Sequence, residues 1–121
     1  MNRDTETSKG FEMVFSENEL TVTVSGEIDH HRAVGLRTEV DGEIARLCPR
    51  RLILDLSRTD MMDSSGLGFI MGRSARVGRI GGELVLRDPT ERVMKILHLA
   101  GLDKTFKIEK TEKTERKDGV R

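Results

Sequence analysis

An apolar run followed by a helical pattern is the strongest constraint that this sequence places on its fold. The run Leu52–Leu56 contains a single charged residue, which is typical of a strand in the interior of a sheet. Residues 63–68 read Asp-Ser-Ser-Gly-Leu-Gly, and apolar residues at helical spacing follow them. The sequence therefore predicts a buried strand that leads into a helix through a loop with two serines. Ser64 is the predicted N-cap, because its hydroxyl can accept a hydrogen bond from the first helical turn.

The rest of the chain continues this alternation of strands and helices. Alternating apolar residues and a turn over 16–19 predict that the first two strands form a hairpin. The predicted strands are 11–15, 20–24, 51–56, 83–87 and 105–108. The predicted helices run from Asp29 to Cys48, from the serine loop to about Arg79, and from Asp88 to Gly101. This order predicts an α/β fold, a sandwich with helices against a mixed sheet of four to five strands.

The ends of the predicted helices carry specific signals. Asp29 is the predicted N-cap of the first helix. Asp88 is the predicted N-cap of the third helix, with Pro89 at its first position and Glu91 completing a capping box. Cys48 is interpreted as a small buried residue at the end of the first helix.

Each helical pattern predicts one face toward the core. The predicted core positions are Ala33, Leu36, Val40, Ile44 and Leu47 in the first helix, Leu67, Ile70, Met71, Ser74 and Val77 or Gly78 in the second, and Val93, Ile96, Leu97 and Ala100 in the third. The glycines of the second helix, Gly66, Gly68 and Gly72, are expected to let that helix pack close to the sheet. Right-handed crossovers would bring the ends of strands 20–24 and 52–56 to one side, and we expect residues 29–31 to neighbour the serine loop there.

Composition limits the classes of function. The chain has 121 residues, and we expect one domain over 11–109, between a loose N-terminus (1–10) and a charged, disordered tail (110–121). Basic and acidic residues number 21 each, so no net charge attracts nucleic acid or a membrane. No apolar run is long enough for a membrane span, and the N-terminus does not read as a signal peptide. With one cysteine, these features favour a cytoplasmic protein that is a monomer when free.

Ser64 could be a ligand contact, a nucleophile, a phosphorylation site or only a helix cap. A hydrolase is disfavoured, because Ser64 has no Gly-x-Ser-x-Gly surroundings and His98 is better explained as a surface or half-buried residue. A metal site at Asp29, His30 and His31 is disfavoured, because adjacent helical residues point about 100° apart. The glycines also do not form a phosphate-binding loop. We therefore expect no catalytic residue, no cofactor and no metal in this chain.

A phosphorylated serine in a docking surface stays open beside the plain N-cap. A phosphate would add about −1.5 to −2 charges beside Asp63, and a helix N-terminus tolerates such a charge. A partner surface fitted to the uncharged loop would not tolerate this charge. Modification could therefore switch binding without unfolding the protein. Met61 and Met62, just before the loop, are equally compatible with the core and with an exposed contact patch.

Three motifs resemble those of a known family. They are residues 26–31 (Gly-Glu-Ile-Asp-His-His), 62–68 (Met-Asp-Ser-Ser-Gly-Leu-Gly) and 80–85 (Ile-Gly-Gly-Glu-Leu-Val). In this order and spacing they resemble the STAS family of bacterial anti-sigma factor antagonists, most closely its sporulation members. The resemblance extends from about residue 11 to residue 108, and it implies the STAS-type α/β sandwich.

The resemblance also implies a function and the residues that carry it. The partner would be an anti-sigma factor that is also a serine kinase, and Ser64 would be the residue it phosphorylates. The unphosphorylated form would bind the kinase with its ADP or ATP and free the sigma factor. Phosphorylation would end that binding until a serine phosphatase resets the protein. The residues implied in partner binding are Asp29, His30, His31, Met62, Asp63, Ser64, Ser65, Gly66 and Leu67.

A second class of function stays open. A STAS-like domain without a switch could bind a nucleotide or another ligand, or could serve as a scaffold. The intact serine pair and the Asp29-His30-His31 turn favour the phospho-switch, because a module without a switch could have lost the serine. The charged tail after Lys110 and the Met61-Met62 pair depart from the family pattern.

Overall fold

The computed structural model describes residues 10–111 of the chain. Its elements in chain order are β1 (Phe11–Ser16), β2 (Glu19–Val24), β3 (Gly26–Ile28), α2 (His30–Leu47), β4 (Arg51–Asp55), β5 (Thr59–Met62), α3 (Ser64–Arg79), β6 (Glu83–Arg87), α4 (Glu91–Leu99) and β7 (Lys107–Glu109). The expected loose N-terminus and charged tail lie almost entirely outside the described residues. None of the helices within residues 10–111 is long and apolar enough to cross a membrane.

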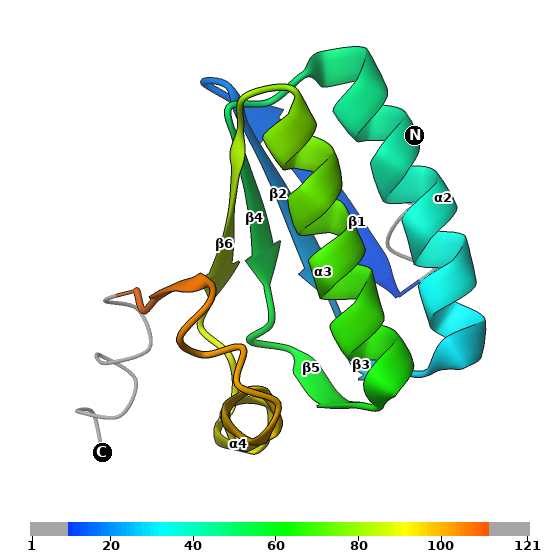
Figure 1. Ribbon diagram of the computed structural model, residues 1–121. Coiled ribbons are helices and arrows are strands. Elements are labelled where there is room, and N and C mark those ends of the chain that lie inside the picture. The colour runs from blue at the N-terminus through cyan, green and yellow to red at the C-terminus, as the bar shows by residue number, and fades with distance from the viewer. Residues whose placement is uncertain (1–9, 112–121) are drawn as a thin grey trace.

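The main sheet is mixed, as predicted, and has five strands in the order β1-β2-β4-β6-β7. The β1–β2 pair is the predicted antiparallel hairpin, and the other neighbours run parallel. Helices α2 and α3 lie side by side over one face of this sheet, and α4 sits below its end, near β5 (Figure 1). The predicted edge strand is present, although it begins two residues later, at Lys107.

The core forms between the sheet and the two long helices. Val22, Leu54 and Leu86 occupy adjacent positions on neighbouring strands and have no exposed area. The predicted face of α2 is confirmed, since Leu36, Val40 and Ile44 are buried and Ala33 and Leu47 pack against the core.

The predicted face of α3 is only partly right. Ile70 and Val77 are buried as expected, whereas Met71 is 51% exposed. Phe69 and Arg73 are buried in its place. The true face contains an arginine, and a helical apolar pattern gives no signal for a buried charge.

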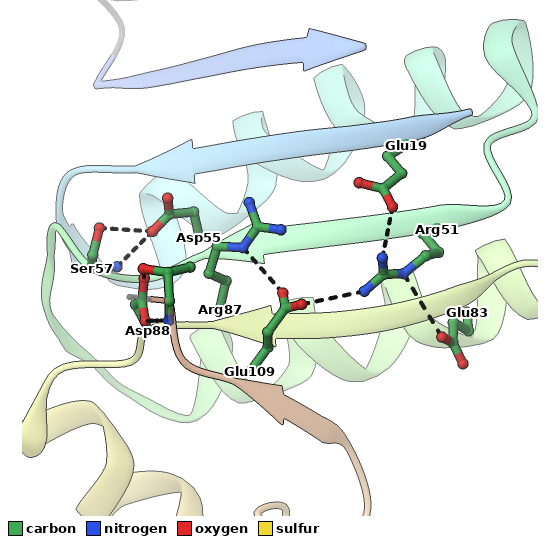
Figure 2. Close-up of polar contacts among 9 residues, drawn as sticks. Glu19, Arg51, Asp55, Ser57, Glu83, Arg87, Asp88 and Glu109 are labelled. Carbon is green, nitrogen blue, oxygen red and sulfur yellow. Dashed lines mark hydrogen bonds and ion pairs between the residues drawn. The ribbon is translucent and has the colours of Figure 1, made fainter. Parts of the chain in front are cut away.

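The face of the sheet that carries no helix is covered by charged side chains. Arg51 on β4 contacts Glu19 of β2 at 2.6 Å and Glu109 of β7 at 3.6 Å, and Arg87 of β6 contacts Glu109 at 3.1 Å (Figure 2). The aliphatic stems of such residues can shield apolar surface. Ile53 on this face is fully buried. The network thus joins four strands and lets the sheet keep one face without a helix.

An ion pair between buried Arg73 and half-buried Asp41 joins α2 to α3. Arg73 Nε lies 2.7 Å from Asp41 Oδ1, and Arg73 Nη2 donates to Asp41 Oδ2 at 3.2 Å. The Arg73 guanidinium also lies 5.2 Å from the centre of the Phe69 ring. Burial lowers the pKa of Arg73, and the charge of Asp41 acts against that fall. The pair fixes the two helices relative to each other, because a buried charge is tolerated only beside its partner.

The N-cap predicted for the last helix is wrong. Thr90 caps α4, accepting a hydrogen bond from Val93 N at 3.2 Å. The carboxylate of Asp88 instead accepts hydrogen bonds from Thr111, at 2.8 Å from its N and 2.7 Å from its Oγ1. Asp88 therefore ties the chain beyond β7 to the end of β6, and the capping-box spacing from Asp88 to Glu91 has no such role.

The interpretation of Cys48 as a buried residue is also wrong, because the structure exposes it. Cys48 ends α2 in the left-handed conformation, with φ 46°, and its N–H donates to Ile44 O at 2.9 Å. The predicted helix end before Pro49 is confirmed.

Removal of Asp41 is expected to destabilise the fold strongly. Asp41→Ala should lower the free energy of unfolding by about 3–5 kcal/mol, because Arg73 would stay charged and unpaired in the interior. The matched control is the double variant Asp41→Leu/Arg73→Leu, which removes both charges and should recover most of that loss. Urea denaturation followed by circular dichroism measures both. Equal losses in the single and double variants would contradict this account of the pair.

Candidate functional site

Two short parallel strands bring the halves of the candidate site together. β3 pairs with β5, with Ile28 opposite Met62, and Asp63 N donates to Ile28 O at 3.3 Å. Asp29 directly follows β3, and Asp63 directly follows β5. The predicted proximity of residues 29–31 to the serine loop is therefore confirmed. Neither strand was predicted, because three or four residues are too few for a clear period-two pattern.

An aspartate caps each of the two long helices. Asp29 Oδ1 accepts from Arg32 N at 2.9 Å, as predicted for α2. At α3 the N-cap is Asp63, whose Oδ1 accepts from Ser65 N at 2.8 Å, so the prediction of Ser64 as N-cap is wrong. Asp and Ser are comparable N-cap residues, and the charge of the carboxylate also favours the positive end of the helix dipole. Because Asp63 caps α3, the hydroxyl of Ser64 is not the N-cap of that helix.

The two serines of the loop have different surroundings. Ser64, the first residue of α3, is exposed, and none of the described residues forms a hydrogen bond with its hydroxyl. Ser65 is half-buried, and its Oγ lies 3.5 Å from His30 Nδ1. Of the two loop serines, Ser64 therefore has the more accessible hydroxyl.

The remaining residues of the site divide between surface and support. The exposed members are His30, His31, Asp63 and Ser64, and the half-buried members are Asp29, Ser65 and Leu67. Met62 is buried at 3% exposure, whereas Met61 is 38% exposed. The sequence was compatible with both a core position and an exposed position for this pair. The structure places Met62 in the core and Met61 on the surface.

Gly66 is the glycine that permits close packing at this site. A Cβ at Gly66 would lie 2.6 Å from Met62 Cβ and 3.2 Å from Ile28 O. Only a residue without a side chain lets the first turn of α3 lie this close to β3 and β5. Gly68 and Gly72 differ from expectation, because a Cβ at either would meet no atom within 4 Å.

Arg32 supports the site and was not predicted from the sequence. Its side chain donates to three carbonyl oxygens, those of Gly10 at 3.1 Å, Ser25 at 3.1 Å and Glu27 at 2.8 Å. These bonds hold the start of α2 against β3, against the residue just before β3 and against the residue just before β1. Contacts to backbone carbonyls require no particular partner residue, so no sequence signal could have indicated them.

The other candidate chemistries gain no support from the geometry. Within residues 10–111 no group of three or more histidine, cysteine or acidic side chains is arranged to hold a metal ion. His98 Nδ1 lies 2.7 Å from Asp103 Oδ2, so its observed partner belongs to the α4 region. The hydrogen bond from His98 lowers the pKa of the Asp103 carboxyl.

Comparison with known proteins identifies the family. Residues 10–115 match the STAS domain family. The anti-sigma F factor antagonist of Paenibacillus polymyxa is 37% identical over 97 residues, which cover 80% of this chain and 83% of that protein. The chain belongs to the STAS domain family, and its relatives include anti-sigma factor antagonists.

Two solved structures of one such relative share the fold. The anti-sigma factor antagonist SpoIIAA in its unphosphorylated form matches with a TM-score of 0.76 and 26% identity, over 92% of this chain and 96% of that chain. The phosphorylated form of SpoIIAA, a Bacillus cell fate determinant, matches with a TM-score of 0.69 and 25% identity, over 92% and 99%. The predicted STAS-type sandwich is confirmed.

The close packing at Gly66 leads to a test by substitution. Gly66→Ala is expected to lower the free energy of unfolding by about 1–3 kcal/mol, because its Cβ would overlap Met62 Cβ and the overlap cannot relax by side-chain rotation. The matched control is Gly68→Ala on the same helix, where space is open and stability should rise by about 0.5–1 kcal/mol. Thermal and urea denaturation measure both variants. A stability gain in Gly66→Ala would refute the close-packing account.

Proposed function

We propose that this chain is an anti-sigma factor antagonist that acts by binding and not by catalysis, with Ser64 as its switch. One observation carries the proposal: Ser64 is exposed at the start of α3, no described residue bonds its hydroxyl, and the Asp29-His30 turn lies beside it. The relatives with similar sequence and fold support the same conclusion.

The unmodified loop would form the docking surface. In this proposal the partner is an anti-sigma factor that is also a serine kinase, and it binds with ADP or ATP in its own site. Asp29, His30, His31 and Asp63 would present polar contacts around Ser64, with Ser65 and Leu67 completing the surface. Met62 and Gly66, which are buried, would hold the loop in place. Binding would release the sigma factor.

Phosphorylation of Ser64 would end this binding by charge. The phosphate adds about −1.5 to −2 charges at physiological pH. The domain tolerates them, because Ser64 is exposed and the positive end of the α3 dipole lies at the phosphate. The partner surface does not, because it would have to bury a new dianion that stands beside Asp63. A serine phosphatase would restore the binding form, and the setting would be a cytoplasmic pathway such as sporulation.

The kinase reaction on Ser64 can be tested directly. Wild type, Ser64→Ala and Ser65→Ala are incubated with a cognate anti-sigma factor kinase and ATP, and intact mass is measured. We expect one phosphate on wild type and on Ser65→Ala, and none on Ser64→Ala, since Ser64 is the more exposed of the two loop serines and no described residue bonds its hydroxyl. Phosphate on Ser64→Ala at a single site would assign the switch to another residue.

Asp29 has two roles, which two substitutions separate. Asp29→Asn keeps an N-cap for α2 and removes the charge, so stability should stay near that of wild type while kinase binding weakens. Asp29→Ala removes the cap as well and should also lose about 0.5–2 kcal/mol of stability. Calorimetric titration and thermal denaturation measure the two effects. Unchanged binding by Asp29→Asn would leave Asp29 with the capping role alone.

A further inference from the structure

A groove between α2 and α3 starts at the serine loop. His30 and Ser65 line one end of it, and Arg37 and Arg73 line it farther along the helices. Its volume is about 320 Å³. The two helices that form its walls lie side by side on the sheet (Figure 1).

Small residues on both helices keep the groove open. Gly68 and Gly72 are one turn apart on α3, and a Cβ on either would meet no atom within 4 Å. Ala33 and Val34 face them from α2, and Val34 is 44% exposed. Phe69, only 4% exposed, is also among the lining residues. The middle of the groove can therefore accept an apolar side chain of moderate size.

Positive charge is in excess at the end of the groove that lies away from the serine loop. Arg73 and Arg76 both contact Asp41, at 2.7 Å and 3.7 Å. Among the described residues, none forms an ion pair or a hydrogen bond with Arg37. Burial is the main cause that lowers the pKa of Arg73, and the charge of Asp41 opposes this fall. The nearby charges of Arg37 and Arg76 lower the pKa of Arg73 further. Arg73 and Arg76 thus share one carboxylate, and Arg37 adds a third guanidinium that no described residue pairs. A negatively charged group bound beside Arg37 would balance this charge.

We propose that this groove receives a segment of the anti-sigma factor in which an acidic side chain reaches Arg37 and an apolar side chain packs between Gly68 and Gly72. The proposal rests on the proposed function, because the groove extends the docking surface at His30 and Ser65. It also gives the switch a physical basis. A phosphate on Ser64 would stand next to Ser65 at the mouth of the groove, and it would repel an acidic segment within the screening length, which is about 10 Å at 0.1 M salt.

The test measures binding of a cognate anti-sigma factor with ADP by calorimetric titration. Gly72→Leu fills the groove, and Arg37→Glu reverses its free charge. The matched controls are Gly42→Leu, at an exposed position of α2 where a Cβ meets no atom within 4 Å, and Arg50→Glu, at an exposed position before β4. Each groove variant should lose about 10-fold or more in affinity and each control about 2-fold or less. Thermal denaturation of the free variants verifies that all four are folded.

The possible results separate this inference from the proposed function. If wild type binds, Ser64→Asp does not, and both groove variants bind like wild type, the groove proposal is wrong and the proposed function stands. If wild type itself does not bind, the proposed function fails and the groove assignment fails with it. If Gly72→Leu instead abolishes a concentration-dependent dimer of the free protein, with binding of the anti-sigma factor intact, a second copy is the occupant and the proposal is overturned.

Discussion

The parallel pairing of β3 with β5 is the interaction on which the site depends. Each strand leads directly into a helix, and the aspartate at each junction caps that helix. Because Ile28 and Met62 are opposite each other in register, Asp29 and Asp63 start their helices from neighbouring positions. A slip of this register would move Ser64 away from the Asp29-His30 turn. A few backbone hydrogen bonds therefore decide whether the two halves form one surface.

The rest of the fold keeps these two junctions fixed while leaving Ser64 exposed. The Asp41–Arg73 pair holds the helices together two to three turns from the loop, and Gly66 lets α3 start close to both strands. Arg32 secures the start of α2 through three carbonyls. In the proposed function, a charge on Ser64 would change what the surface binds without changing the core, because Met62 and Gly66 beneath the loop are buried. A switch that acts on recognition needs this separation of exposed hydroxyl from rigid support.

The sequence predicted the elements that repeat a clear period and missed those that do not. The five strands of the main sheet, the three helices and the proximity of the two motifs follow from apolar spacing and from the crossover rule. β3 and β5 were too short to show a pattern, and the face of α3 was misread because it includes Arg73. At two helix starts the sequence offered two candidate N-caps, and the observed caps are Asp63 and Thr90. At the second start, Asp88 is bonded instead to Thr111, a contact between residues far apart in the sequence. The roles of the site residues came from the family resemblance, not from the spacing.

In the proposed function, phosphate on Ser64 changes binding and leaves the fold intact. The most direct measurement is a calorimetric titration of the unmodified and the Ser64-phosphorylated protein into the anti-sigma factor kinase with ADP, with thermal denaturation of both forms. We expect a loss of about 100-fold or more in affinity, equivalent to about 2.7 kcal/mol, with nearly the same melting temperature. Equal affinities would contradict the claim, and so would a loss of affinity accompanied by unfolding of the phosphorylated domain.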